Sequence, residues 1–192
     1  MSRGVRSLLA CGMLTALVLV PGSPATAASN VHAMKVYVSY ADGIRSDPTL
    51  PSPWDGDEGV RFIGAGDVFD AGAIRIVNPS RQPLTIDDVS VDIGSATYDL
   101  WGPYPIVVAG KSSLVLTQTA EFDFDFDTSE PDVATCEPTG DIPLVHIVVG
   151  SRNPKTRTFT DAGQVLNTGG VDPGACTGAN EGQDWVRIHG HD

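Results

Sequence analysis

Apolar and polar residues alternate in short runs along most of the chain, which is the pattern of strands that bury one face. The alternation is clearest over Met34–Tyr40, Leu84–Ile93 and Leu144–Val149. Within Leu84–Ile93 it breaks at Asp87 and Asp88, which predicts a β-bulge or a change of sheet. Further strands are expected at Ala73–Val77, Tyr98–Trp101, Pro105–Val108, Ser113–Thr117, Arg157–Phe159 and Trp185–Ile188.

Turn-forming residues separate these runs, for example Asn78–Ser80, Ala109–Lys111 and Thr168–Gly170. Beyond the N-terminal region, no long segment repeats its apolar residues at the helical period. The pattern therefore predicts an all-β fold, an antiparallel β-sandwich of about nine strands, in one domain over residues 28–192. The stretch 42–59 is rich in Pro, Gly and Asp and is expected to be a long surface loop.

The N-terminus differs from the rest of the chain. Arg3 and Arg6 precede an apolar run over Leu8–Val20, and the small residues Ala25–Ala27 follow it. This order is typical of a cleaved secretory signal peptide, here residues 1–27, and the apolar run is short for a membrane-spanning helix. We therefore expect a secreted, extracellular protein with no membrane anchor.

Charge narrows the choice of partner. The chain has 12 Lys and Arg against 24 Asp and Glu, a net charge of -12. Loss of Arg3 and Arg6 with the leader leaves 10 basic residues and a net charge of -14. Nucleic acid is excluded as an expected partner because its phosphates would be repelled. The acidity serves either solubility or the binding of cations.

Two cysteines, Cys136 and Cys176, remain after removal of a leader that contains Cys11. An even number of cysteines in an oxidising compartment predicts a disulfide bond. Closing a loop of about 40 residues stabilises the fold by about 4 kcal/mol in the chain-entropy model.

The segment Glu121–Asp127 alternates acidic residues with phenylalanines. A strand would place the phenylalanines on one face and the aspartates on the other, and it fits better than a calcium-binding loop because Thr128 stands where that loop needs glycine. Such a charged strand is expected at a sheet edge. Calcium remains a possible cofactor, held by Asp125, Asp127 and Asp132.

Aromatic and imidazole side chains supply the other candidates. Trp54 lies in a Pro-rich loop, so Trp54 and Tyr104 are the residues expected to bind a ligand, for instance by stacking on a sugar. Trp101 and Trp185 fall in apolar alternation and are expected in the core. His146 is expected to face the surface or to be a hydrogen-bonded core residue rather than a metal ligand.

Two resemblances add to this picture. Residues 73–116 resemble the first half of a lamin-tail-type immunoglobulin-like domain in the segments Ala73–Asn78, Leu84–Ile86, Asp99–Trp101, Ala109–Gly110 and Leu114–Leu116. Most of the mature chain resembles a group of uncharacterised secreted bacterial β-sandwich proteins, through Phe62–Gly64, Asp70–Ile76, Asp99–Gly102, Phe126–Ser129, Gln164–Gly170, Asn180–Glu181 and Trp185. These resemblances imply an immunoglobulin-like sandwich and export, and they assign no catalytic residue.

No G-x-S-x-G or H-E-x-x-H motif occurs in the sequence. We therefore expect a non-catalytic, monomeric binding or surface-associated module, with a polysaccharide or another component of the cell envelope as its partner. Two alternatives stay open: a small secreted hydrolase with loop carboxylates in an acidic cleft, and a structural envelope protein.

Overall fold

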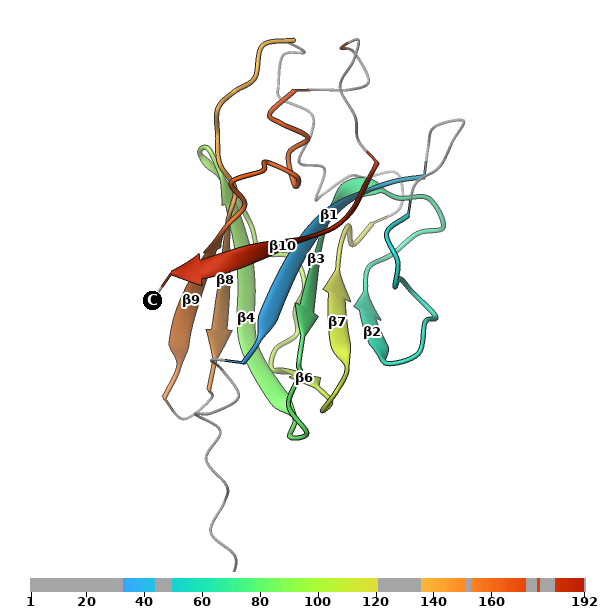
Figure 1. The fold of residues 1–192 in the computed structure, drawn as a ribbon, viewed down its shortest axis with the longest axis vertical. Coiled ribbons are helices and arrows are strands. Elements are labelled where there is room, and N and C mark those ends of the chain that lie inside the picture. Colours follow the sequence, from blue (N-terminus) through green and yellow to red (C-terminus); the bar gives the residue numbers. More distant parts are fainter. Residues whose placement is uncertain are drawn as a thin grey trace, which may run out of the picture.

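The computed structural model describes residues 33–43, 50–120, 136–150, 153–171, 176 and 182–191. These residues form ten strands and no helix (Figure 1). The strands are β1 (Lys35–Asp42), β2 (Val60–Ile63), β3 (Asp70–Val77), β4 (Leu84–Ile93), β5 (Ala96–Tyr98), β6 (Ile106–Val108), β7 (Ser113–Leu116), β8 (Leu144–Val149), β9 (Lys155–Thr160) and β10 (Gln183–His191). The all-β prediction is confirmed.

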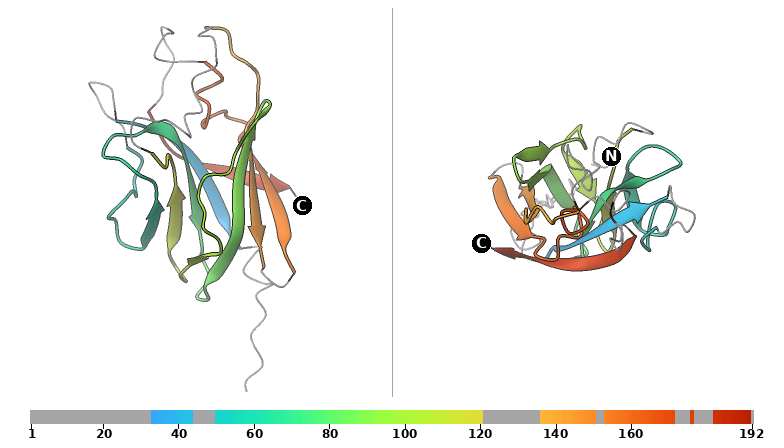
Figure 2. Two further views of the ribbon diagram at one scale, coloured as in Figure 1. Left: turned by 180° about the vertical axis from the view of Figure 1, so that it is seen from behind. Right: turned by 90° about the horizontal axis from the view of Figure 1, so that it is seen from above.

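All ten strands belong to one sheet in the order β2-β7-β3-β1-β10-β9-β8-β4-β5, and β6 pairs with β4. The sheet curls like half of a barrel because β10 changes partners along its length. Val186 and Ile188 pair with β1, whereas His189 and His191 pair with β9. Seen from above, β10 runs along one side of the molecule and links β1 to β9 (Figure 2).

The purely antiparallel arrangement expected from the sequence is corrected at one edge. β2 pairs with β7 in parallel, with Phe62 opposite Val115, while the other pairs of described strands are antiparallel. A parallel pair needs a long connection. Here that connection carries β3, β4, β5 and β6, so the sheet is mixed.

The hydrophobic core fills the concave side of the curl. It takes alternate residues of the strands, for example Val36 and Val38 of β1 and Val145 and Ile147 of β8. Trp101 is fully buried among them, and its Nε1 donates to the carbonyl of Thr117 at 2.7 Å. The prediction that Trp101 is a core residue is confirmed. Because inward residues alternate with outward ones, the same registers fix which side chains lie on the convex outer face.

Several of the observed strands agree with those expected from the local alternation of apolar and polar residues, and others do not. Leu144–Val149 is β8 as expected, and the register shift of β4 between Ile86 and Asp88 confirms the predicted bulge. The strand expected at Tyr98–Trp101 is displaced, since β5 ends at Tyr98. β2 was not expected. The expected strand over Glu121–Asp127 lies outside the described residues.

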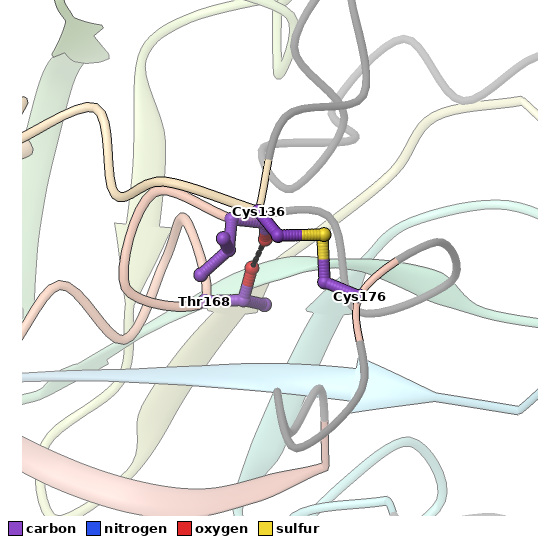
Figure 3. The surroundings of a disulfide bond; sticks show 4 residues. Cys136, Thr168 and Cys176 are labelled. Carbon is purple, nitrogen blue, oxygen red and sulfur yellow. Dashed lines mark hydrogen bonds between the residues drawn. A yellow bond between two sulfur atoms is a disulfide. The ribbon is translucent and has the colours of Figure 1, made fainter.

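Cys136 and Cys176 form the predicted disulfide, with their Cα atoms 5.3 Å apart. Figure 3 shows the bond beside Thr168 of the turn that follows β9. That turn contains positive φ angles at Thr168, Gly169 and Gly170, in agreement with the turn expected there. The amide of Thr139 donates to the carbonyl of Gly170 at 3.0 Å, so the segment after Cys136 is attached to the same turn.

Candidate functional site

The outer face of β1, β3 and β7 has a covered half. Small or branched residues, Ala41, Ala73 and Val115, lie at its surface and are fully buried by aromatic rings. Trp54 from the loop after residue 50 packs edge-on against Phe62 and Phe69, with ring centroids 5.2 and 5.4 Å away. Trp185 of β10 adds a fourth ring, 6.1 Å from Trp54.

This packing differs from the exposed loop position expected for Trp54, whose ligand-binding role stays a prediction. The side chain is only 9% exposed, and neighbouring rings occupy its surroundings. Trp185, expected in the core, instead belongs to this second cluster, where its Nε1 donates to the carbonyl of Pro53 at 3.1 Å. Both tryptophans therefore attach the loop to the sheet.

Tyr104 is also occupied by the fold. Its hydroxyl accepts from the amide of Val89 at 3.0 Å and is 3.2 Å from the carbonyl of Val89, to which it donates. Burial raises the pKa of Tyr104 to about 12, against the lowering effect of the hydrogen bond from Val89. The hydroxyl of Tyr104 thus forms a bridge to β4, and its ligand-binding role stays a prediction.

Below the covered half, the same outer face is open and basic. Tyr37 of β1 stands directly opposite Arg75 of β3 on one side and Arg187 of β10 on the other. Lys35 lies two residues before Tyr37 and therefore projects from the same face. We call these four residues the Tyr37 patch; Lys35 and Arg187 are exposed, and Tyr37 and Arg75 are half-buried.

Arg75 is held in place within this patch. Its guanidinium carbon lies 5.8 Å from the centre of the Tyr37 ring, a cation–π contact, and its Nε donates to Ser113 Oγ at 3.4 Å. Partial burial lowers the pKa of Arg75, while Tyr37 and Asp184 act in the opposite direction. The guanidinium stays charged because arginine does not lose its proton in proteins. A partly desolvated, oriented cation is prepared to bind an anion.

A second polar group lies on the outer face of the other part of the sheet. His146 of β8 has Nδ1 3.0 Å from Thr158 Oγ1 and Nε2 3.1 Å from Asp92 Oδ2. Asp92 in turn accepts from Thr97 Oγ1 at 2.6 Å. We call these four residues the His146 row. The side chains of His146 and Asp92 are 25% and 43% exposed, which confirms the surface-facing alternative for His146.

The His146 row has the order hydroxyl, imidazole, carboxylate that is used to activate a nucleophile. Acyl transfer also needs donors directed at the developing oxyanion. The amides of β8 and β9 lie in the plane of the sheet and pair with each other along the strands, so they do not point above Thr158. The hydroxyl, imidazole and carboxylate groups of the row can donate and accept hydrogen bonds with a hydroxyl-rich ligand.

The carboxyl group of Asp161 is buried inside the fold. Asp161, fully buried after β9, accepts from the amide of Leu166 at 2.9 Å. Burial raises its pKa, and hydrogen bonds from the backbone of Leu166, Val165 and Gly163 oppose that effect. Because these amides donate to the carboxyl group, the Asp161 side chain stabilises the turn that follows β9.

The proposed calcium ligands Asp125, Asp127 and Asp132 lie outside the described residues. Within the part of the chain that the structure describes, no three His, Cys, Asp or Glu side chains are grouped so as to hold a metal ion. The same part contains no helix long and apolar enough to cross a membrane.

The Tyr37 patch was missed by sequence reasoning. Lys35 and Tyr37 occupy the polar positions of a run correctly assigned as a strand, and that alternation was the available signal. Arg75 and Arg187 are far away in sequence. Only the pairing of β1 with both β3 and β10 brings them to Tyr37.

Comparisons with known proteins found no matching family model, no matching curated protein and no matching solved structure.

Proposed function

We propose that this chain is a secreted, non-catalytic binding module that recognises an anionic polysaccharide outside the cell. The observation that carries the proposal is the Tyr37 patch, where Lys35, Arg75 and Arg187 gather around an aromatic ring in a chain of net charge -12. The signal-peptide pattern supports export. The Cys136–Cys176 disulfide supports it too, because such bonds persist mainly in oxidising compartments.

The chemistry of the patch favours an acidic sugar. A guanidinium presents planar donors that match a carboxylate, and Arg75 is already oriented by Tyr37 and Ser113. The exposed Arg187 and Lys35 add charge on either side of the ring. The open outer face of the sheet can accommodate an extended polymer. Binding should weaken with added salt because exposed charges are screened.

The immunoglobulin-like relationship implied by residues 73–116 also stays a proposal. It is supported by the antiparallel pairing of β3 with β7 and of β4 with β6 within that stretch. Recognition on a surface of a rigid β scaffold is common in such proteins.

The direct test is titration calorimetry with polygalacturonate, using neutral dextran as the control ligand. We expect Arg187→Gln to lower the affinity by roughly tenfold, the scale of one charge-assisted hydrogen bond, and Arg75→Gln with Arg187→Gln to lower it further. Arg81→Gln, an exposed arginine in the turn between β3 and β4, is the matched control and should retain binding. Equal affinity of the Arg187 variant and the wild type would contradict the proposal, as would equal binding of dextran.

A further inference from the structure

The Tyr37 patch and the His146 row lie on one continuous outer surface, and β10 joins them. Arg187 stands opposite Tyr37, and two residues further on the exposed His189 stands opposite Thr160 of β9. Thr160 projects from the same side of β9 as Thr158, where the His146 row begins. Figure 2 shows how β10 runs from β1 to β9 along the curled sheet.

The separation of the two groups is within reach of one extended ligand. β10 is the single strand between β1 and β9, so two strand spacings, about 10 Å, separate Tyr37 from Thr158 across the strands. Tyr37 stands opposite Arg187 and Thr158 opposite His191, which adds about 13 Å along β10. An oligosaccharide of several sugars spans that distance, whereas a single sugar does not.

The two groups differ in the chemistry that they offer. The Tyr37 patch contributes cations, which select an acidic sugar. The His146 row contributes the hydroxyls of Thr158 and Thr97, an imidazole and the carboxylate of Asp92. Hydroxyls of a neutral sugar can both donate to Asp92 and accept from this row. An acidic sugar placed there would face the charge of Asp92, which is repulsive at short range.

Resting on the function proposed above, we infer that the ligand is a polysaccharide in which acidic sugars alternate with neutral ones. The acidic sugar occupies the Tyr37 patch, and a neutral sugar of the same chain binds along the His146 row. The carboxylate of Asp92 makes the row selective against polymers in which every sugar is acidic. A peptide of acidic residues alone, such as polyglutamate, lacks the hydroxyls that this row recognises.

The test compares two polymers of different pattern by calorimetry. Hyaluronan octasaccharide alternates acidic and neutral sugars, and oligogalacturonate of the same length carries a carboxylate on every sugar. We expect the wild type to bind hyaluronan more tightly. Thr158→Val and His146→Gln should each weaken hyaluronan binding several-fold, the scale of one hydrogen bond, and leave oligogalacturonate binding unchanged. Thr156→Val, on the same face of β9 but outside the row, is the matched control.

Asp92→Asn provides a test in the opposite direction. The amide oxygen still accepts from Thr97, while the negative charge is removed, so affinity for oligogalacturonate should rise several-fold. Circular dichroism and thermal unfolding establish that each variant is folded before its affinity is interpreted. Because this arm predicts a gain, a damaged fold cannot imitate it.

The outcomes separate this inference from the proposed function. If Arg187→Gln weakens binding of both polymers but the His146 and Thr158 variants change neither, the function stands and the alternating-sugar inference is wrong. If Arg187→Gln changes neither, the proposed function itself fails. Equal competition by polyglutamate would assign the surface to an acidic peptide and overturn the inference.

Discussion

One face of the sheet has a covered half, over Ala41, Ala73 and Val115, and an open half, the Tyr37 patch. Strands β1 and β3 contribute residues to both halves. In the covered half, small side chains leave room for rings contributed by the loop and by β2. In the open half, β1 and β3 carry Tyr37 and Arg75 instead. Residue size along each strand therefore decides where a loop packs and where the sheet stays available to a ligand.

The largest loss of stability is expected when an aromatic ring is removed from the covered half. Trp54→Ala removes a side chain that packs against Phe62, Phe69 and Trp185, and should cost about 3–5 kcal/mol of unfolding free energy, measured by denaturant titration. Trp54→Phe is the matched control, since it keeps a ring and Trp54 Nε1 has no hydrogen-bond partner among the described residues. A loss below about 1 kcal/mol for the alanine variant would show that the loop is not attached this way.

A smaller loss of stability is expected when a side-chain atom is added to the closely packed covered half. A Cβ on Gly64 would lie 2.7 Å from Phe62 Cε1 and 2.7 Å from Thr117 Cγ2, so Gly64→Ala should displace the Phe62 ring and cost about 1–3 kcal/mol. Gly163→Ala, where the nearest side-chain atom is 3.6 Å away, serves as the control. Equal stability of the two variants in thermal unfolding would argue against close packing at Phe62.

The third prediction contrasts the buried charge with the exposed charges of the open half. Burial raises the pKa of Asp161 above its ordinary value of 3.8, so the folded state holds that proton more tightly than the unfolded state. The resulting stabilisation is complete below the ordinary pKa and is lost as pH rises through the pKa of the folded state, at about 1.4 kcal/mol for each pKa unit. Asp161→Asn should remove this dependence. Parallel curves of unfolding free energy against pH for both proteins would contradict the assignment.

The smallest effect on stability is expected in the open half. Arg187 is exposed, so Arg187→Gln should change the unfolding free energy by no more than about 0.5 kcal/mol while still weakening polygalacturonate binding. A large loss of stability would mean that the side chain of Arg187 contributes to packing of the fold. Denaturant titration beside calorimetry separates the two effects.

The sequence correctly predicted several features that depend on a local pattern of residues. Alternation located β8 and the β4 bulge, cysteine number identified Cys136–Cys176, and Trp101 was placed in the core. Features that depend on distant pairing were missed. The short β2 has too few residues for a clear alternation, and its parallel pairing with β7 is not encoded locally.

The site was less predictable for the same reason. Trp54 looked exposed because its loop is rich in proline, but the small residues Ala41 and Ala73, distant in sequence, make room for its ring. Tyr37 and His146 acquire their partners only across strands. Local sequence therefore described which residues face outward, and the registers determined which of them meet.

Amide chemical shifts of labelled protein, followed during titration with hyaluronan octasaccharide, map the surface that binds the anionic polysaccharide. The largest changes are expected at Lys35, Tyr37, Arg75 and Arg187; they should diminish with added salt and leave the residues around Trp54 unchanged. Changes centred on the covered half, or no changes at saturating ligand, would show that the Tyr37 patch is not the binding surface.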